Sequence, residues 1–363
     1  MKKIIYLLSV LFLFACNEKS EEVSIRQIKV SLTNTSDRAA YSHSTVIILE
    51  TNENCLLENV VKVKSSNDGI YLLSSYGGNI YKFSKEGQFL WKLSKGEGPR
   101  DLVFPTDFYY SDVDDCLYVL DNYRTIKQYL SNGNYVKETK VDTPSFLFEK
   151  LGNKSMMFNP NLTTNSNCYL NVYENDVLNF KGLPIEKKAK KVSFMPSNVF
   201  VRSEENGMYY IQHMLSDTIY TYKMQSDEIR PAFYIDTDKK TVNSLDTEFN
   251  DTRSYYQISE REGLIAGVAG LSFLNEKLYL MMYYHNKPWY IVHDLKNEST
   301  MTTNSLCDGI PNSLRCVGRE KDYVVYSYWP EELFEKEDEL CDEVKEQLRR
   351  VDKDDNPILI LLN

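Results

Sequence analysis

Short apolar runs recur along most of the chain, and polar turn residues separate them. The first group of runs covers residues 60–63, 69–73, 79–83 and 89–93. Each run is rich in β-branched and aromatic side chains, which is typical of β-strands. Lys85-Glu86-Gly87 separates the last two runs, and its glycine suits a tight turn that needs a positive φ. The pattern predicts one antiparallel unit of four strands.

Similar units follow this first one to the end of the chain. A second copy covers 116–120, 125–129 and 135–138, with a turn at Ser131-Asn132-Gly133. Weaker copies lie within 155–173, 207–222, 277–293 and 322–362. Six small units spaced roughly 40 to 70 residues apart cannot each bury two apolar faces, so they must stack around a common axis. The fold class is therefore all-β, and we predict a six-bladed β-propeller closed by pairing the strand 46–50 with the last blade.

Two segments interrupt the strand pattern and favour helices. The segment 245–261 is polar and poor in β-branched residues. In 331–350, an apolar stripe recurs at helical spacing, and Pro330 suits the first turn. The stripe consists of Leu333, Phe334, Leu340, Val344 and Leu348. We expect a short helical insertion in the last blade that packs on its own core, with a partner-binding helix as the alternative.

The first sixteen residues have the layout of a secretory signal. Met1-Lys2-Lys3 is basic, residues 4–14 carry no charge, and Ala15 stands before Cys16. A cysteine directly after a small residue resembles a bacterial lipobox, and the resemblance implies that Cys16 is lipidated and becomes the mature N-terminus. We expect a signal peptide over 1–15, a lipidated tether over 16–43 and the propeller over 44–363. A buried N-terminal helix is the alternative.

The residues behind Cys16 bear on localisation. Residues 17–22 carry three glutamates, and such a patch is similar to the acidic signals that send lipoproteins of Bacteroidota to the outer face of the outer membrane. A solvated linker is the alternative. We expect a cell-envelope protein that its N-terminal lipid anchors to the membrane, in the outer membrane. Stable anchoring needs two or more acyl chains, which a lipobox cysteine normally carries.

Several segments resemble one known family. Gly96-Glu97-Gly98-Pro99 looks like the G-x-G-P turn of the six-bladed β-propeller lipoproteins of Bacteroidota, and 46–50 and 217–220 are similar to other recurrent segments of that family. Arg100-Asp101 stands where the family often has Gly-Glu. The resemblance implies an NHL-type propeller. Related propellers bind proteins, glycans or RNA, and some are hydrolases or lyases. No catalytic residue is carried over, because the family is mostly uncharacterised.

Charge narrows the class of partners. The 363 residues include 42 basic and 52 acidic ones, and removal of Lys2 and Lys3 with the signal peptide lowers the net charge from −10 to −12. Nucleic-acid binding depends on lysine and arginine at phosphates, so we expect no nucleic-acid partner. Electrostatic attraction to anionic lipid is disfavoured for the same reason. The membrane is therefore a partner only through the N-terminal lipid.

Known catalytic and metal-binding motifs are missing from the sequence. His43, His213, His285 and His293 form neither H-x-H nor H-E-x-x-H, so we expect structural histidines. The acidic run 112–115 lacks the glycine and the distant glutamate of a calcium loop and favours an ordinary turn. We predict no metal site, no cofactor and no catalytic residue. The glycine-rich segment 263–270 is interpreted as blade packing.

The cysteines leave two alternatives open. Cys55, Cys116, Cys168, Cys307, Cys316 and Cys341 form no C-x-x-C pair. We expect small buried apolar residues. A disulfide between Cys307 and Cys316, which lie close in sequence, is the alternative in an exported protein.

Aromatic side chains give the one candidate binding loop. Tyr283, Tyr284, His285 and Trp289 lie within seven residues, together with Asn286 and Lys287. Tyrosine stacks on ligand rings while its hydroxyl stays solvated. We expect binding rather than catalysis: a lipid-anchored protein that presents one propeller face to a glycan, peptide or partner protein. The alternative is a propeller hydrolase or lyase with a metal in the central channel.

Overall fold

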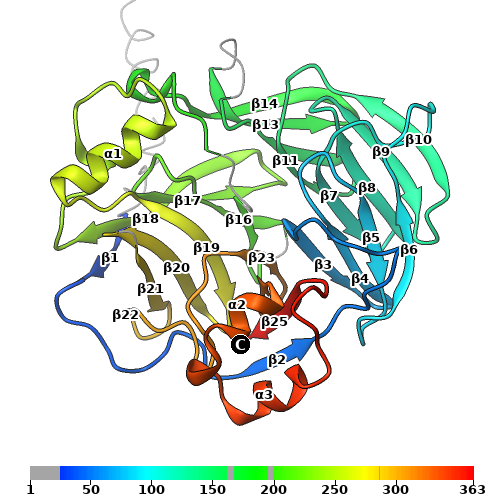
Figure 1. The fold of residues 1–363 in the computed structure, drawn as a ribbon. Helices are drawn as coiled ribbons and strands as arrows, with labels where there is room; N and C mark the ends of the chain where they lie inside the picture. The colour runs from blue at the N-terminus through cyan, green and yellow to red at the C-terminus, as the bar shows by residue number, and fades with distance from the viewer. Residues whose placement is uncertain (1–24, 162–166, 195–198, 206, 286) are drawn as a thin grey trace, which may run out of the picture.

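The chain forms a ring of six β-sheets in the computed structural model, which describes residues 25–161, 167–194, 199–205, 207–285 and 287–363 (Figure 1). The predicted all-β, six-bladed propeller is confirmed. The signal peptide and Cys16 lie outside the described residues. Blade 1 contains β3 (Lys62–Ser66), β4 (Gly69–Leu73), β5 (Ile80–Phe83) and β6 (Phe89–Leu93). Blade 2 contains β7 (Pro105–Ser111), β8 (Cys116–Asp121), β9 (Thr125–Leu130) and β10 (Tyr135–Lys140).

Blades 3 and 4 follow in chain order. Blade 3 contains β11 (Leu147–Leu151), β12 (Lys154–Phe158), β13 (Cys168–Glu174) and β14 (Val177–Pro184). Blade 4 contains β15 (Phe200–Arg202), β16 (Met208–Ile211), β17 (Thr218–Lys223) and β18 (Glu228–Thr237). An additional strand from the start of the chain, β1 (Arg26–Val30), pairs in parallel with β18, so this blade has five strands.

Blades 5 and 6 complete the ring. Blade 5 contains β19 (Val268–Leu274), β20 (Lys277–Tyr284), β21 (Lys287–Asp294) and β22 (Ser299–Thr303). Blade 6 contains β23 (Cys316–Arg319), β24 (Val324–Tyr328), β25 (Ile358–Leu362) and β2 (Ser44–Ile47). Because β2 comes from the beginning of the chain and β25 from its end, their pairing closes the ring, as predicted. The observed strand begins and ends somewhat earlier than the expected 46–50.

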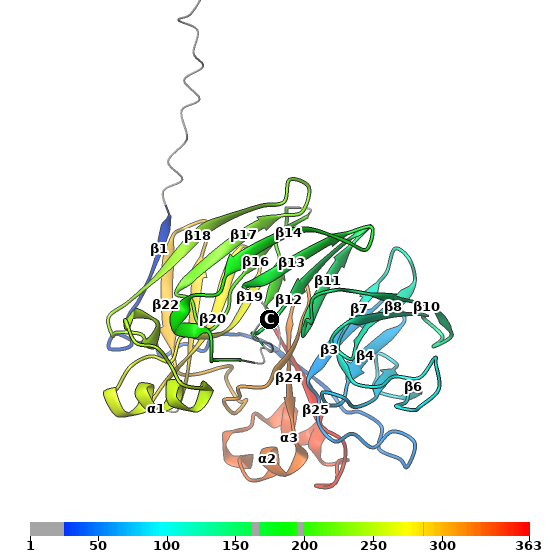
Figure 2. The same ribbon diagram turned by 90° about the horizontal axis from the view of Figure 1, so that it is seen from above.

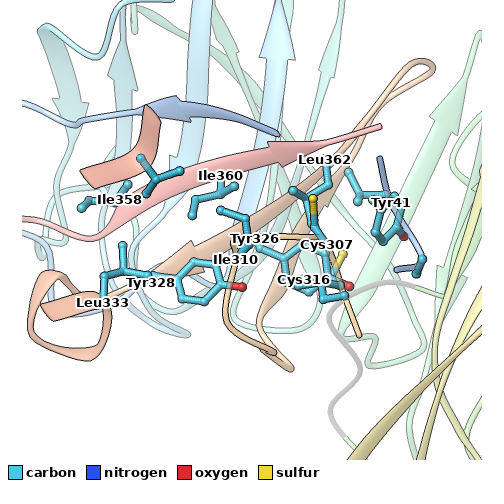
Figure 3. Close-up of a cluster of buried hydrophobic side chains, with 14 of the residues drawn as sticks. Tyr41, Cys307, Ile310, Cys316, Tyr326, Tyr328, Leu333, Ile358, Ile360 and Leu362 are labelled. Atoms are coloured by element: carbon cyan, nitrogen blue, oxygen red, sulfur yellow. The ribbon is translucent and has the colours of Figure 1, made fainter. Parts of the chain in front are cut away.

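The hydrophobic core is divided among the blade interfaces. Six clusters of buried side chains in the described part of the chain each lie between two neighbouring blades, and a seventh lies beneath helix α1. In Figure 3, the cluster between blades 5 and 6 gathers Tyr326, Ile360 and Leu333. Central strands such as β4 and β8 are buried along their whole length because both sheet faces meet a neighbour.

Turns at the two ends of the propeller carry different elements. Connections between the second and third strands of each blade, and those from one blade to the next, lie at one end, which we call the helical face. Helices α1 (Thr252–Glu262), α2 (Pro330–Phe334) and α3 (Asp342–Leu348) lie along it (Figure 2). Hairpin turns at Gly87 and Gly133, with φ of 89° and 85°, lie at the other end, the hairpin face. Strand β1 begins there (Figure 2).

The polar segment before β2 is not a solvated tether throughout, because it packs on the propeller from Arg26 onward. Ile28 and Val30 are buried between blades 4 and 5. Tyr41 stacks on Tyr279 with ring centroids 4.8 Å apart (Figure 3). The alternation of polar and apolar residues in this short edge strand is too weak to mark it in the sequence, so the expected tether 16–43 is wrong from Arg26 onward.

The two predicted helical segments are shorter than expected. The short helix η2 (Val242–Ser244) lies directly before 245–261, and a loop follows it. Helix α1 begins after Asp251, whose side chain accepts from the amide of Ser254. Gly263 ends α1 with φ 60°, so this glycine is a helix cap rather than blade packing.

The insertion 331–350 lies in the last blade, as predicted, but it is not one helix. It divides into α2, η3 (Glu337–Glu339) and α3. Leu340 is extended, and the amide of Cys341 donates to the carbonyl of Gly309, which interrupts the helix. The buried Leu333, Val344 and Leu348 still pack into the core, whereas Phe334 is exposed.

The G-x-G-P turn is explained by a side chain rather than by an unusual φ. Neither Gly96 nor Gly98 has a positive φ. A Cβ on Gly96 would lie 2.1 Å from Oδ2 of Asp101, and the amide of Gly98 donates to the same oxygen at 2.9 Å. Asp101, which replaces the glutamate of the resembled family, therefore fills the space that the glycines leave.

None of the six cysteines that the structure describes forms a disulfide. Cys55, Cys116, Cys307 and Cys316 are buried, which matches the expectation of small apolar residues. The alternative disulfide between Cys307 and Cys316 is not formed.

Among the helices of the described residues, none has the length and apolar character needed to cross a membrane.

The closure of the ring leads to a first prediction. In the double variant Val46→Pro, Ile47→Pro, β2 loses a backbone donor to β25. We expect the free energy of unfolding to fall by roughly 3 kcal/mol or more. The variant loses a hydrogen bond, and it also opens the ring where β2 pairs with β25. Urea unfolding followed by tyrosine and tryptophan fluorescence measures this change.

The control places the same two prolines in another outer strand, as Lys137→Pro, Glu138→Pro in β10. This strand does not join the chain ends, so its loss should cost about 1–2 kcal/mol. Equal costs for the two double variants would contradict a special role of β2.

Candidate functional site

A pocket of about 490 Å³ opens on the helical face over blades 3, 4 and 5. The end of β12, the start of β13 and the start of β19 form its floor. The loop 212–217 of blade 4, the connection before blade 4 and helix α1 form its sides. Phe158, Tyr169, Val268 and Met281 are at most 8% exposed, whereas Tyr256 and Leu314 at the rim are exposed by 42% and 38%. The pocket therefore has a closed floor and an apolar, accessible rim.

Aromatic rings form two of the walls. Phe158 and Tyr169 stack with ring centroids 5.7 Å apart and planes at 10°, and the ring of His213 lies 4.5 Å from Tyr169. On the side of α1, Phe194 and Tyr256 meet edge to face at 5.6 Å. Such contacts hold the rings in fixed orientations, so the walls are formed before any ligand binds.

Three polar atoms of the lining have no hydrogen-bond partner among the described residues. They are the hydroxyl of Tyr169, Oγ of Ser193 and Nδ1 of His213, and all three are buried. Two other polar side chains of the pocket are satisfied, because Gln212 donates to the carbonyl of His213 and Thr252 donates to that of Ser193. An unpaired buried polar group costs about 1–3 kcal/mol, so this end of the pocket favours a guest that completes the hydrogen bonds.

The pocket is electrically neutral. None of its described lining residues is Asp, Glu, Lys or Arg. Burial lowers the pKa of His213 to about 4, so its imidazole is neutral at physiological pH. Burial also raises the pKa of Tyr169 far above its usual range and that of Tyr256 to about 12, so both hydroxyls keep their protons. The described lining therefore offers neutral hydrogen-bond donors and acceptors.

The predicted binding loop is a tight hairpin between β20 and β21, and it contributes one residue to the pocket. Tyr283 lines the pocket, but Tyr284 and Trp289 face the other side of the sheet and pack between blades 4 and 5. His285 occupies the turn with φ 50°, and its ring contacts Tyr284 at 4.1 Å. Asn286 lies outside the described residues. Because successive strand residues point to opposite faces, one sequence cluster was split between two environments.

Most pocket residues were missed in the sequence because they come from separate blades. Phe158 and Tyr169 lie in runs predicted only as strands, and Phe194 and Tyr256 lie in connections. His213 was expected to be a satisfied structural histidine, yet its Nδ1 has no partner in the described chain. The only local signal of this pocket in the sequence was His213, which lies beside Met214 in the loop 212–217.

A group of charged side chains lies at the axis of the ring. Three cations and three carboxylates on or beside the innermost strands face one another in pairs. The pairs are Lys62–Asp107 at 2.5 Å, Lys64–Glu320 at 2.5 Å and Arg202–Glu149 at 3.8 Å. Burial raises the pKa of Glu149, although Lys62 and Arg202 lie near it. In the part of the chain that the structure describes, no three His, Cys, Asp or Glu residues gather as a metal site would require.

The acidic run 112–115 forms the turn between β7 and β8, as expected. Asp114 accepts from Ser111 and Tyr118, and Asp115 accepts from Tyr110 and Ser131. Two of the three carboxylates of this run therefore stabilise the turn.

Comparison with known proteins places the chain among its relatives. A family model described as "Domain of unknown function (DUF4934)" matches residues 25–363. The chain belongs to this family. None of the curated proteins matches the DUF4934 chain.

Two solved structures are similar to the DUF4934 chain in fold. One is a "Putative exported protein" from Bacteroides fragilis NCTC 9343, with 19% identity, a TM-score of 0.77 and coverage of 93% of this chain and 99% of that chain. The other is a member of the DUF4221 family from Bacteroides vulgatus ATCC 8482, with 10% identity, a TM-score of 0.52 and coverage of 89% and 96%. At these identities the similarity establishes the propeller and leaves the ligand open.

The burial of His213 predicts a pH dependence for the DUF4934 chain. An exposed histidine has a pKa of about 6.5, and burial lowers that of His213 to about 4. Between these values the unfolded chain binds more protons than the folded chain, so stability is lost as the pH falls from 6.5 to 4. We expect His213→Gln to weaken this loss by roughly 2 kcal/mol in urea unfolding at pH 7 and pH 4.

The control is His43→Gln, which changes an exposed histidine. It should leave the pH profile of the parent unchanged. An identical pH dependence in His213→Gln and the parent would show that His213 is solvated and titrates normally.

Proposed function

We propose that this chain is a lipid-anchored cell-envelope protein that uses the pocket on its helical face to bind an uncharged group of a glycan, peptide or partner protein. The observation that carries the proposal is the neutral pocket with aromatic walls and three unpaired polar atoms. The signal-like residues 1–15, Cys16 and the similarity to a protein named as exported support the location in the envelope.

The position of the first described residues supports a pocket that faces away from the membrane. Strand β1 is parallel to β18, and β18 runs from the hairpin face toward the helical face. Ile25 therefore lies at the end of the propeller opposite the pocket (Figure 2). Eight residues separate Cys16 from Ile25, and the nine steps from residue to residue span at most about 31 Å when fully extended. An anchor at Cys16 would hold the hairpin face toward the membrane and turn the pocket away from it.

The chemistry of the pocket suits binding better than hydrolysis. It presents neutral donors, aromatic faces and the flexible side chains of Met214 and Met281, and such lining is typical of ligand pockets. The carboxylates at the axis each lie beside a cation. A hydrolase or lyase with a metal in the channel stays an untested alternative.

We predict that Cys16 carries the anchor. In Cys16→Ser, the protein should lose acyl labelling and move from the membrane fraction to the soluble fraction, because no other segment is expected to hold it there. The control is Cys341→Ser, which changes a partly buried thiol at the start of α3 and should stay acylated. A membrane-bound, acylated Cys16→Ser protein would rule out this anchor.

The binding role is tested by photo-crosslinking in living cells. A benzophenone amino acid replaces Tyr256 or Leu314 at the pocket rim, or the fully accessible Val113 on the hairpin face. We expect a defined adduct from the two rim positions and none from Val113. Adducts from Val113 alone, or none from either rim position, would contradict binding at the helical face.

A further inference from the structure

We infer that the pocket selects an uncharged ring that carries a single hydroxyl or carbonyl group, for which a phenol is the simplest probe. The inference rests on the proposed function and specifies the class of ligand. It combines the character of the walls, the missing charges and the number of unpaired polar atoms. Each of these excludes a different kind of guest.

The walls favour a ring. Six of the lining residues are Tyr or Phe, and they come from blades 1, 3 and 5, the connection before blade 4 and helix α1. The stacked pair Phe158 and Tyr169 at the floor and the edge-to-face pair Phe194 and Tyr256 at the side expose both ring faces and ring edges. A planar guest meets these surfaces in the offset or edge-to-face arrangements that aromatic groups prefer.

The missing charges exclude ionised guests. A carboxylate or ammonium group would leave water for a site with no described Lys, Arg, Asp or Glu to pair with it. Burial of an unpaired charge is far more costly than burial of a neutral polar group. The neutral state of His213 at physiological pH leaves this site without a cation.

The polar atoms match one small functional group. The Tyr169 hydroxyl, Ser193 Oγ and His213 Nδ1 are the buried polar atoms of the described lining that have no partner, and all three belong to residues that line the pocket. A hydroxyl group donates one hydrogen bond and accepts two, which suits this set. A free sugar carries hydroxyls around its whole ring, and most of them would lie unpaired against Val268, Met281 and Leu215.

The test uses the full mature chain as Cys16→Ser with its methionine methyl groups labelled with carbon-13. Met214 and Met281 line the pocket, whereas Met156 and Met157 are buried in blade 3 and serve as internal references. The probes are 4-methylphenol, toluene, 4-hydroxybenzoate and methyl glucoside. N-acetyl-tyrosinamide is added to distinguish a peptide side chain from a free small molecule as the source of the phenol.

We expect 4-methylphenol to shift the Met214 and Met281 signals and to bind about fivefold more tightly than toluene, since one neutral hydrogen bond contributes about that factor. The charged 4-hydroxybenzoate should bind at least a hundredfold more weakly. The preference for 4-methylphenol over toluene should disappear in at least one of Tyr169→Phe, Ser193→Ala and His213→Phe. It should persist in the control Tyr234→Phe, which changes an exposed tyrosine of β18.

Three results would overturn the inference. In the first, methyl glucoside shifts the same two methionines at equal or lower concentration, which leaves the proposed binding function intact and makes the ligand a glycan. In the second, none of the three pocket variants changes the preference for 4-methylphenol over toluene. In the third, no probe shifts Met214 or Met281. The crosslinking at Tyr256 and Leu314 is independent of all three, so it decides separately whether the pocket binds at all.

Discussion

The fold depends on one constraint, which is that both faces of every blade are apolar. A sheet of this kind needs a neighbour on each side, and only a closed ring gives all six blades two neighbours. Burial of one large aliphatic or aromatic side chain contributes about 1.5–3 kcal/mol, and each interface gathers many of them. The pairing of β2 with β25 joins the two ends of the propeller. The hydrophobic contacts of the whole ring therefore depend on the four residues of β2.

The charged pairs at the axis have a different role from the apolar interfaces. Lys62–Asp107 joins blades 1 and 2, Arg202–Glu149 joins blades 4 and 3, and the amide of Phe148 donates to Asp107 at 2.7 Å. A buried ion pair returns little net stability, because the cost of desolvation offsets the attraction between the charges. A buried ion pair does, however, require defined distances and directions between its charged groups. These pairs therefore fix how neighbouring innermost strands are aligned, while the hydrophobic clusters supply the stability.

The sequence contained enough information for the architecture and too little for the site. Strand runs and turn glycines such as Gly87 and Gly133 depend on neighbours close in the chain, so they are visible in the order of the residues. The pocket is lined by Tyr76 of blade 1 and by Tyr283 of blade 5. A local sequence pattern does not indicate which loops meet across a ring. The cluster at 283–289 was the most aromatic loop, but strand alternation turned Tyr284 and Trp289 into an interface. Leu340 shows the same limit for helices, because a contact with a distant loop ended a helix that its own sequence would continue.

The segment 25–47 crosses three neighbouring blades before it closes the ring. It adds β1 to blade 4, runs across blade 5 with hydrogen bonds from Ser36 and Tyr41 to the carbonyls of Thr302 and Leu306, and ends as β2 in blade 6. Asp238, which follows β18 directly, accepts from the amides of Leu32 and Thr33.

Burial by itself would raise the pKa of the Asp238 carboxyl. The hydrogen bonds from the amides of Leu32 and Thr33 and from the hydroxyls of Ser31 and Thr33 outweigh it and lower this pKa. The chain continues from Asp238 to α1, which carries Thr252 and Tyr256 into the pocket. The residue that fastens the N-terminal segment therefore begins the connection that builds one wall of the site. If Cys16 carries the proposed anchor, a force on it would first reach β1 and the hydrogen bonds of Asp238, so these contacts would set how firmly the pocket is held relative to the membrane.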